Sequence, residues 1–424
     1  MKRLEDSKKT NLELMVDILG VMHRHRKASP TIKSDEVYYE LMGDYYKKIV
    51  NAKEEGKFIG GHTVMAPIEL FHAMDIVPLH LESTAAMMTI MLNKYGEYLG
   101  TASEAGLAPE VCSAHRILAA SCIKGEISPP NFILWTNQVC DNTAKSGDLL
   151  MDQFRCPGFF LERPYRGNGV EFSYFVRELE RLIHFLEEQT GRKMDYDRLR
   201  EVVALSWRTV QLYREIYQLR KAIPAPMKNR TFVNMLIAGW LCLATPEGVA
   251  YLELIRDEIR EKVENKQGAI PQERFRLISC FIPPFYELKL LDWLEREYGA
   301  SIVMESGNAW VGQDNIDLSK PLESLAMINL HFSTIKQMHG PADSFIRDTL
   351  RIAREFKPHG ALYFAHIGCR QACALIRSIK DALQEECNIP TLVLDCDVMD
   401  PSFASTDDLK DKLEGFFEML TERL

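Results

Sequence analysis

Three cysteines in separate parts of the chain are the residues best suited to chemistry. Cys112, Cys140 and Cys369 lie in the segments EVCSAHRILAASC, NFILWTNQVCDNTAK and ALYFAHIGCRQAC. None of them belongs to a CxxC pair, so their thiols can meet only after the chain has folded. Three thiolates that meet would leave one position of a metal centre open, and an open position is where a substrate can bind. The pattern therefore indicates a reactive metal site.

Burial in the core is the alternative for any single cysteine, because free thiols commonly pack as small apolar side chains. The chain has ten cysteines. Most of them need no special role, and the residues that we expect in the core are Cys242, Cys280, Cys387 and Cys396.

The sequences around Cys140 and Cys369 each predict the same unit: a strand, a loop that carries the cysteine, a helix and a second strand. In open parallel sheets, ligands bind at the carboxyl ends of the strands, where these two loops would lie. Both thiols would also lie near helix N-termini, whose N–H groups and partial positive charge favour thiolates and an anionic cluster. The predicted elements are residues 132–135, 142–154 and 159–161 around Cys140, and residues 362–364, 371–386 and 391–394 around Cys369.

The domain organisation follows from changes in periodicity along the chain. A chain of 424 residues that is 46% apolar has enough material for two cores. Short apolar runs broken by Gly and Pro alternate with helical patterns in two regions, and a long helical pattern separates them. The prediction is a helical N-terminal extension (1–50), a first α/β domain (51–165), a helical connecting region (166–270) and a second α/β domain (271–424).

Composition and charge exclude several classes of function. The net charge of −9, with no sustained run of Lys and Arg, argues against nucleic acid or anionic membranes as partners. The N-terminus is too charged for a signal peptide, and the longest apolar stretch, 232–244, is too short to span a bilayer. No glycine-rich phosphate loop is present. We therefore expect a cytoplasmic protein.

Five segments of the chain resemble one known family. They are GGHTVMAPIELFHAMDIVPLHLE, CSAHRILAASCIKGEISPPNFILWTNQVCDNTAK, RKMDYDRLREVV, HIGCRQACALIRSIKDALQEECNIPTLVLDCDVMDPSFAS and LEGFFEML. Together they are similar to the 2-hydroxyacyl-CoA dehydratases, a family that includes the cluster-bearing subunits of ATP-dependent benzoyl-CoA reductase. The resemblance covers residues 55–424 and implies two Rossmann-like or flavodoxin-like domains with parallel sheets and a helical insertion.

The resemblance also implies a cofactor and a reaction. Cys112, Cys140 and Cys369 would hold a [4Fe-4S] cluster whose fourth iron can bind the thioester carbonyl of an acyl-CoA. The implied activity is that of an (R)-2-hydroxyacyl-CoA dehydratase, a lyase that removes water by a reductive radical route. The implied partners are an ATP-dependent iron-sulfur activator protein, which supplies one electron, and a related second subunit.

Three alternatives stay open at this stage. A benzoyl-CoA reductase-type subunit would use the same cofactor but consume the electrons. A double-cubane protein with an [8Fe-9S] assembly, which reduces small molecules, is favoured if Cys122, Cys156 or Cys373 faces the same cleft. The third alternative is a non-catalytic partner subunit.

Two further residues are candidates for catalysis. Thr63 follows the first strand of the core, where some members of the family carry a hydroxyl near the open iron; a bond to nearby backbone is the alternative. Glu82, at the end of a predicted strand over 76–82, is placed like a carboxyl used for proton transfer; a solvated charge is the alternative. Glu69, by contrast, suits the first turn of a helix, where an acid favours the dipole.

Charged residues beside the cysteine segments allow two interpretations. His115, Arg116 and Arg370 could offset the charge of a cluster or bind CoA phosphates, although arginine is more commonly a surface charge. The acidic residues of LDCDVMDP resemble a family motif, but capping and turn formation explain them without a second metal. These three are Asp395, Asp397 and Asp400.

Overall fold

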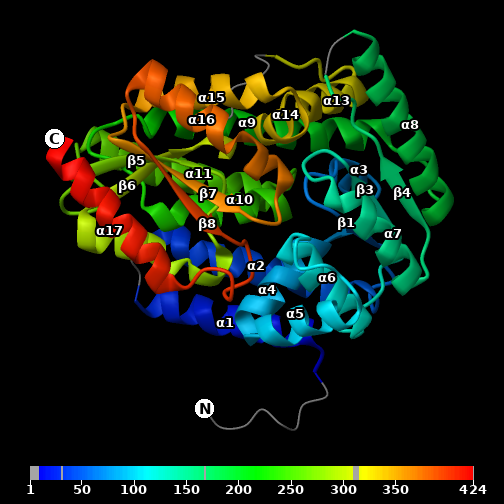
Figure 1. Ribbon diagram of the computed structural model, residues 1–424. Coiled ribbons are helices and arrows are strands. Elements are labelled where there is room, and N and C mark those ends of the chain that lie inside the picture. The colour runs from blue at the N-terminus through cyan, green and yellow to red at the C-terminus, as the bar shows by residue number, and fades with distance from the viewer. Residues whose placement is uncertain (1–8, 30–31, 167–168, 309–314, 424) are drawn as a thin grey trace.

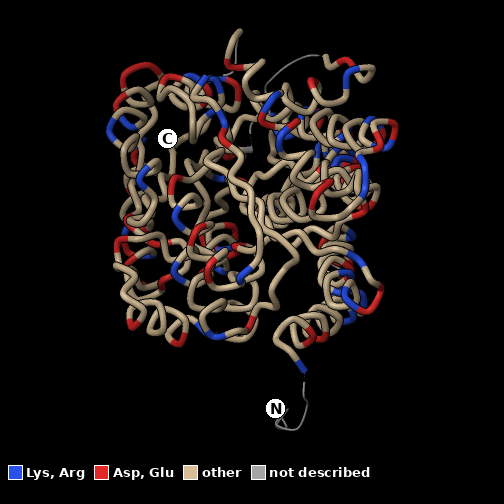
Figure 2. The backbone as a smooth tube through the Cα atoms, turned by 90° about the vertical axis from the view of Figure 1, so that its right-hand side faces the viewer, with Lys and Arg blue, Asp and Glu red and all other residues tan. Residues whose placement is uncertain are grey.

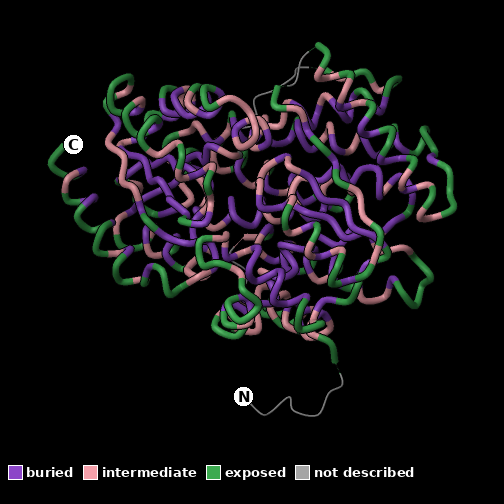
Figure 3. The backbone as a smooth tube through the Cα atoms, turned by 45° about the vertical axis from the view of Figure 1, so that its right-hand side comes forward, coloured by how far each residue is buried: buried purple, intermediate pink, exposed green. Residues whose placement is uncertain are grey.

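The computed structural model describes residues 9–29, 32–166, 169–308 and 315–423 of the chain. Two four-stranded parallel sheets lie in separate lobes, and helices surround both of them (Figure 1). Buried residues are concentrated around the strands of both lobes, and exposed residues lie at the rim (Figure 3). The predicted α/β class with parallel sheets and an N-terminal helical stretch is confirmed.

The first lobe is built on the sheet β2-β1-β3-β4. Gly60 in β1 is required by close packing, because a Cβ there would lie 2.4 Å from the ring of Phe71. Its elements are β1 (Ile59–His62), α3 (Glu69–Ala73), β2 (Val77–His80), α4 (Leu81–Leu92), α5 (Tyr95–Glu104), α6 (Ser113–Ile123), β3 (Phe132–Thr136), α7 (Asn142–Phe154) and β4 (Gly158–Leu161).

The strand predicted over 76–82 is shorter than expected. The strand β2 ends at His80, and Leu81 already begins α4. The reason is local, because the Nδ1 atom of His80 accepts a hydrogen bond from the Ser83 N–H at 3.2 Å and so caps the helix. Glu82 therefore lies in the first turn of a helix instead of at a strand end.

The second lobe repeats the topology of the first. Its sheet has the order β6-β5-β7-β8, and all pairs are parallel. Both sheets therefore show the 2-1-3-4 order of flavodoxin-like folds, in which ligands bind outside the strand ends where the strand order reverses. Its elements are β5 (Phe275–Cys280), η1 (Phe285–Glu287), α12 (Lys289–Tyr298), β6 (Ala300–Glu305), η2 (Ser306–Asn308), α13 (Pro321–His331), α14 (Ser333–His339), α15 (Ala342–Phe356), β7 (Gly360–His366), α16 (Arg370–Cys387), β8 (Thr391–Cys396) and α17 (Thr406–Arg423).

Helices outside the two sheets join the lobes. They are α1 (Asn11–Ala28), α2 (Lys33–Ala52), α8 (Val170–Thr190), α9 (Tyr196–Leu219), α10 (Asn229–Leu241) and α11 (Pro246–Glu264). Arg220, the residue after α9, is buried and forms a two-bond ion pair with Glu305 at the end of β6, at 2.6 and 2.9 Å. Removing one partner of such a buried pair would leave an uncompensated charge, so this contact fixes the helical region to the second lobe.

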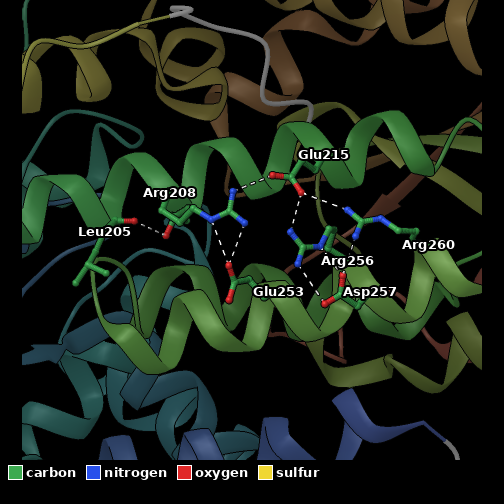
Figure 4. A network of polar contacts seen from close by, with 8 residues as sticks. Leu205, Arg208, Glu215, Glu253, Arg256, Asp257 and Arg260 are labelled. Atoms are coloured by element: carbon green, nitrogen blue, oxygen red, sulfur yellow. Dashed lines mark hydrogen bonds and ion pairs between the residues drawn. The ribbon is translucent and has the colours of Figure 1, made fainter.

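An ion-pair network also fixes α9 to α11 (Figure 4). Glu215 on α9 accepts from Arg208 and from Arg256 of α11, both at 2.8 Å. Arg208 also reaches Glu253 at 3.0 Å. These side chains are partly exposed, so each pair is worth little by itself, and the network matters mainly because it links the same two helices several times.

In the view of Figure 2, Lys and Arg are interspersed with Asp and Glu around the outside of the molecule. In the part of the chain that the structure describes, no helix is both long enough and apolar enough to cross a bilayer. Of the four cysteines expected in the core, Cys242, Cys280 and Cys396 are buried. Cys387 is only half-buried, because it is the last residue of α16 and lies where that helix reaches the surface.

Candidate functional site

A cavity of about 240 Å³ lies between the two lobes and the helix α10. Residues that follow β1 and β3 of the first sheet line one side, and residues that follow β5, β6 and β7 of the second sheet line the other. The cavity therefore lies where both folds are expected to bind ligands, at the carboxyl ends of parallel strands.

The structure brings Cys112, Cys140 and Cys369 together at this cavity. Cys112 and Cys369 are the N-cap residues of α6 and α16, and Cys140 precedes α7 by two residues. All three are half-buried. Two cysteines come from the first lobe and one from the second, so the set is complete only when both lobes are folded and in contact.

Three contacts hold the cysteine segments against one another. Gly368 packs on the backbone of Cys112 so closely that a Cβ at Gly368 would lie 2.5 Å from the Cα of Cys112. Arg370 and Asp141, the neighbours of Cys369 and Cys140, form an ion pair of 2.5 Å. The Ser113 hydroxyl, beside Cys112, donates to the buried carboxylate of Asp397 in the second lobe.

Burial dominates the electrostatics of the three thiols. It raises the pKa of Cys140 to about 12 and that of Cys369 to about 11. The pKa of Cys112 is raised well above its ordinary value, by burial first and then by the neighbouring Cys140 and Cys369. Without a cation beside them, these side chains are protonated at neutral pH, so a metal must displace their protons.

The helix N-termini oppose this effect of burial. The backbone N–H groups of Ala114, Asn142 and Ala372 point to Cys112, Cys140 and Cys369 respectively and lower each pKa. These donors stabilise sulfur that carries negative charge. Among the described residues no group of three or more His, Cys, Asp or Glu side chains could hold a single metal ion. Three thiols at one cavity, each with its own backbone donor, are a donor set that fits an iron-sulfur cluster.

His115 is a polar neighbour of Cys140. Its Nε2 atom lies 3.5 Å from the Cys140 Sγ, and its Nδ1 atom lies 2.8 Å from the Ser146 hydroxyl. Burial lowers the pKa of His115 to about 4, so the ring is neutral at pH 7 and gives no charge to offset a cluster.

The two arginines considered beside the cysteines are occupied elsewhere. Arg116 is buried; it donates to the Ser103 hydroxyl at 3.1 Å and lies 3.7 Å from the Asp400 carboxylate. Arg370 is exposed and pairs with Asp141. Neither lines the cavity.

Glu82 lines the cavity, and Thr63 does not. The Glu82 Oε2 atom accepts the Val64 N–H at 2.8 Å and lies 3.6 Å from the Nδ1 atom of His80, while Oε1 is buried without a hydrogen-bond partner. Burial raises the pKa of Glu82 to about 8, so the side chain is protonated at neutral pH. The Thr63 hydroxyl is also buried and has no hydrogen-bond partner. The predicted role of Thr63, a hydroxyl near the open iron, stays a prediction.

The remaining candidates do not line the cavity. Cys122, Cys156 and Cys373 do not line it, and the Cys373 thiol donates to the His366 carbonyl at 3.2 Å. Asp397 accepts the N–H groups of Met399 and Asp400 at 2.9 Å, the turn role expected for this motif. Glu69 is buried and accepts from the Ser206 hydroxyl at 2.6 Å, which fits a structural role.

Sequence reasoning missed the wall that α10 contributes. Phe232, Leu236 and Trp240 line the cavity from this helix. The signal is present in the apolar stretch 232–244, which is too short to span a bilayer but long enough to form a buried helix. Their spacing of four residues places all three on one face of a helix.

Two four-stranded parallel sheets of flavodoxin-like order, with three thiols at the cavity between them, define the class of α/β protein to which this chain belongs. The family model described as 2-hydroxyglutaryl-CoA dehydratase, D-component, matches residues 63–420, and the chain belongs to this family.

Known relatives match over most of their length. The chain is 24% identical to a benzoyl-CoA reductase subunit of Thauera aromatica, over 91% of this chain and 94% of the relative. It is 21% identical to the (R)-phenyllactyl-CoA dehydratase alpha subunit of Clostridium sporogenes, with 92% and 96% covered. It is also 21% identical to the (R)-2-hydroxyisocaproyl-CoA dehydratase alpha subunit of Clostridioides difficile, with 91% and 96% covered.

Proposed function

We propose that this chain is the cluster-bearing subunit of an (R)-2-hydroxyacyl-CoA dehydratase, a lyase that removes water from a 2-hydroxyacyl-CoA. The observation that carries the proposal is the meeting of Cys112, Cys140 and Cys369 at one interlobe cavity. Family membership and full-length similarity to dehydratase alpha subunits support it. The relatives are named as subunits, so we also propose a related second subunit as a partner.

Cys112, Cys140 and Cys369 would hold a [4Fe-4S] cluster. When bound, such a cluster supplies Lewis-acid binding of a thioester carbonyl and transfer of single electrons. A separate ATP-dependent activator protein would supply the electron. In a dehydratase this electron would be returned at the end of each turnover, so only a catalytic amount would be needed. His115, hydrogen-bonded to Ser146, would keep its Nε2 atom directed at the Cys140 sulfur.

Glu82 would hold a proton inside the cavity. Its Oε2 atom accepts a backbone N–H, so the proton belongs on Oε1, the carboxyl oxygen without a partner. A protonated carboxyl at neutral pH can donate to a leaving hydroxyl, and its conjugate base can then accept a proton. The apolar walls around it exclude bulk water, which keeps the pKa raised.

A benzoyl-CoA reductase-type activity is the second candidate. This activity is supported by the 24% identity of the chain with a benzoyl-CoA reductase subunit, compared with 21% for each of two dehydratase alpha subunits. The two candidates differ in electron use: a reductase consumes electrons with each turnover, whereas a dehydratase needs only a catalytic amount. The ratio of product to reductant consumed therefore separates them.

Iron and sulfide analysis after anaerobic purification tests the cofactor. We expect about four irons for each chain, whereas a double cubane requires about eight. Changing Cys140 or Cys369 to Ser is expected to remove most of the iron and the visible absorption. Cys387→Ser is the matched control, because Cys387 lies at the surface end of α16 and should leave both intact. Full iron retention in both ligand variants would contradict the assignment.

A further inference from the structure

The cavity walls are apolar on several sides. Aromatic and aliphatic side chains come from α10 and from the segment after β5, and Val398 and Met399 close a third side. Phe232, Leu236 and Trp240 come from α10, and Phe281 and Phe285 come from the segment after β5.

The described lining of this cavity offers no cation. It contains neither a Lys nor an Arg. Three histidines line the cavity, and each has a ring nitrogen engaged by the protein itself: His80 by the Ser83 N–H at 3.2 Å, His115 by the Ser146 hydroxyl at 2.8 Å and His366 by the Ile282 carbonyl at 2.7 Å.

Among the lining residues that the structure describes, the acidic side chains are two carboxyls. Glu305 is paired with the buried Arg220, whose two terminal nitrogens are both engaged by its carboxylate. Glu82 is the second carboxyl. A ligand carboxylate would thus be buried beside acids and mostly apolar groups. Neutral donors such as the Ser306 hydroxyl lie in the lining, but no described lining residue is a Lys or Arg that could pair with its charge, and this burial is costly.

We infer that the acyl group bound here is uncharged and apolar, aromatic or branched aliphatic, and that acyl groups ending in a carboxylate are rejected. The inference rests on the proposed function, since it specifies the substrate class of the same site. The phosphates of the CoA moiety must lie outside the cavity for the same electrostatic reason.

The inference is tested by measuring, with calorimetry, the affinity of acyl-CoA thioesters for the anaerobically purified protein, with any copurifying partner retained. The probes are (R)-phenyllactyl-CoA, (R)-2-hydroxyisocaproyl-CoA and (R)-2-hydroxyglutaryl-CoA, with free CoA as the reference. We expect the two apolar thioesters to bind at least about tenfold more tightly than the dicarboxylic one. Equal or tighter binding of (R)-2-hydroxyglutaryl-CoA overturns the inference alone. If no thioester binds better than free CoA, the proposed function fails as well.

A substitution in the cavity wall provides a second test. Leu236→Lys places a cation at the acyl group, so it should reverse the order and favour (R)-2-hydroxyglutaryl-CoA by at least about tenfold. Leu236→Met is the matched control and should keep the wild-type order, because the side chain stays apolar and similar in size. An unchanged order in a folded Leu236→Lys protein would show that the lack of a cation in this cavity does not set the preference between the acyl groups, and would overturn the inference. If that variant does not fold, the wild-type comparison decides.

Discussion

At the scale of single residues, burial sets the protonation state of the site. Glu82 keeps a proton at neutral pH because the apolar cavity disfavours its charged form, although one backbone N–H opposes the effect. Burial likewise raises the pKa of the three cysteine thiols. A buried acid of this kind has a measurable consequence for stability.

We predict that Glu82→Gln removes a pH dependence of the unfolding free energy. The pKa of Glu82 is about 8 in the folded protein and near its ordinary 4.5 when unfolded. Between these values the folded state binds the extra proton, so wild-type stability should fall as pH rises, by at most about 1.4 kcal/mol per pH unit from this group. Urea unfolding of both proteins at pH 5, 6.5 and 8 measures the effect. A constant difference between them across this range would mean that Glu82 is ionised in the fold.

At the scale of elements, three helix N-termini and one glycine assemble the site. The helices α6, α7 and α16 each begin at or just after a cysteine and direct N–H groups at its sulfur. Gly368 lets the loop before α16 lie against the backbone of Cys112. The approach of the three thiols to one another therefore depends on Gly368, a residue without a reactive side chain.

We predict that Gly368→Ala reduces both stability and iron retention. The added methyl group would meet the Cys112 backbone, so the Cys369 loop must shift, at a cost of about 1–3 kcal/mol. The matched control is Gly100→Ala in α5, where a Cβ meets nothing within 4 Å and alanine should stabilise the helix by about 0.5–1 kcal/mol. Urea unfolding and iron content measure the two effects. If both variants behaved alike, the close approach at Gly368 would not matter for the site.

At the scale of the whole molecule, the proposed ligands span two lobes. Cys112 and Cys140 belong to the first and Cys369 to the second, and among the described residues the polar contacts that cross between these segments include the Arg370–Asp141 and Ser113–Asp397 pairs. The Arg370–Asp141 pair is largely exposed, so it contributes little to holding the lobes together. A cofactor bound by all three thiols would add a connection between the lobes to those that the helices and buried hydrogen bonds supply, such as the bond from Arg163 to the Leu330 carbonyl at 3.0 Å.

We predict that removing iron destabilises the entire protein. Anything that binds only the folded state stabilises it, so anaerobic chelation should lower the thermal midpoint by at least about 3 °C. The Cys369→Ser variant lacks the proposed ligand of the second lobe. Its thermal midpoint should be below that of the wild-type protein before any treatment, and the chelator should not lower it further. A wild-type midpoint that chelation does not move would mean that the cofactor does not connect the lobes.

The sequence alone predicted the elements around the reactive cysteines closely. The helix expected over 142–154 is α7 with the same bounds, and that expected over 371–386 differs from α16 by one residue at each end. These predictions succeed because helical periodicity and Gly and Pro breakers act locally. Where a side chain capped the backbone, as His80 does, the prediction of an element boundary was wrong.

The α/β fold with parallel sheets could be predicted from the chain alone, and so could the candidate ligand residues, because both predictions use residue type and short-range spacing. Only the tertiary structure decided that three cysteines from two lobes line one cavity, and that Cys122, Cys156 and Cys373 do not. It also decided the protonation of Glu82 and the apolar wall from α10. These properties depend on which side chains are buried against one another and shielded from water. Packing between segments that are far apart in the sequence determines this burial.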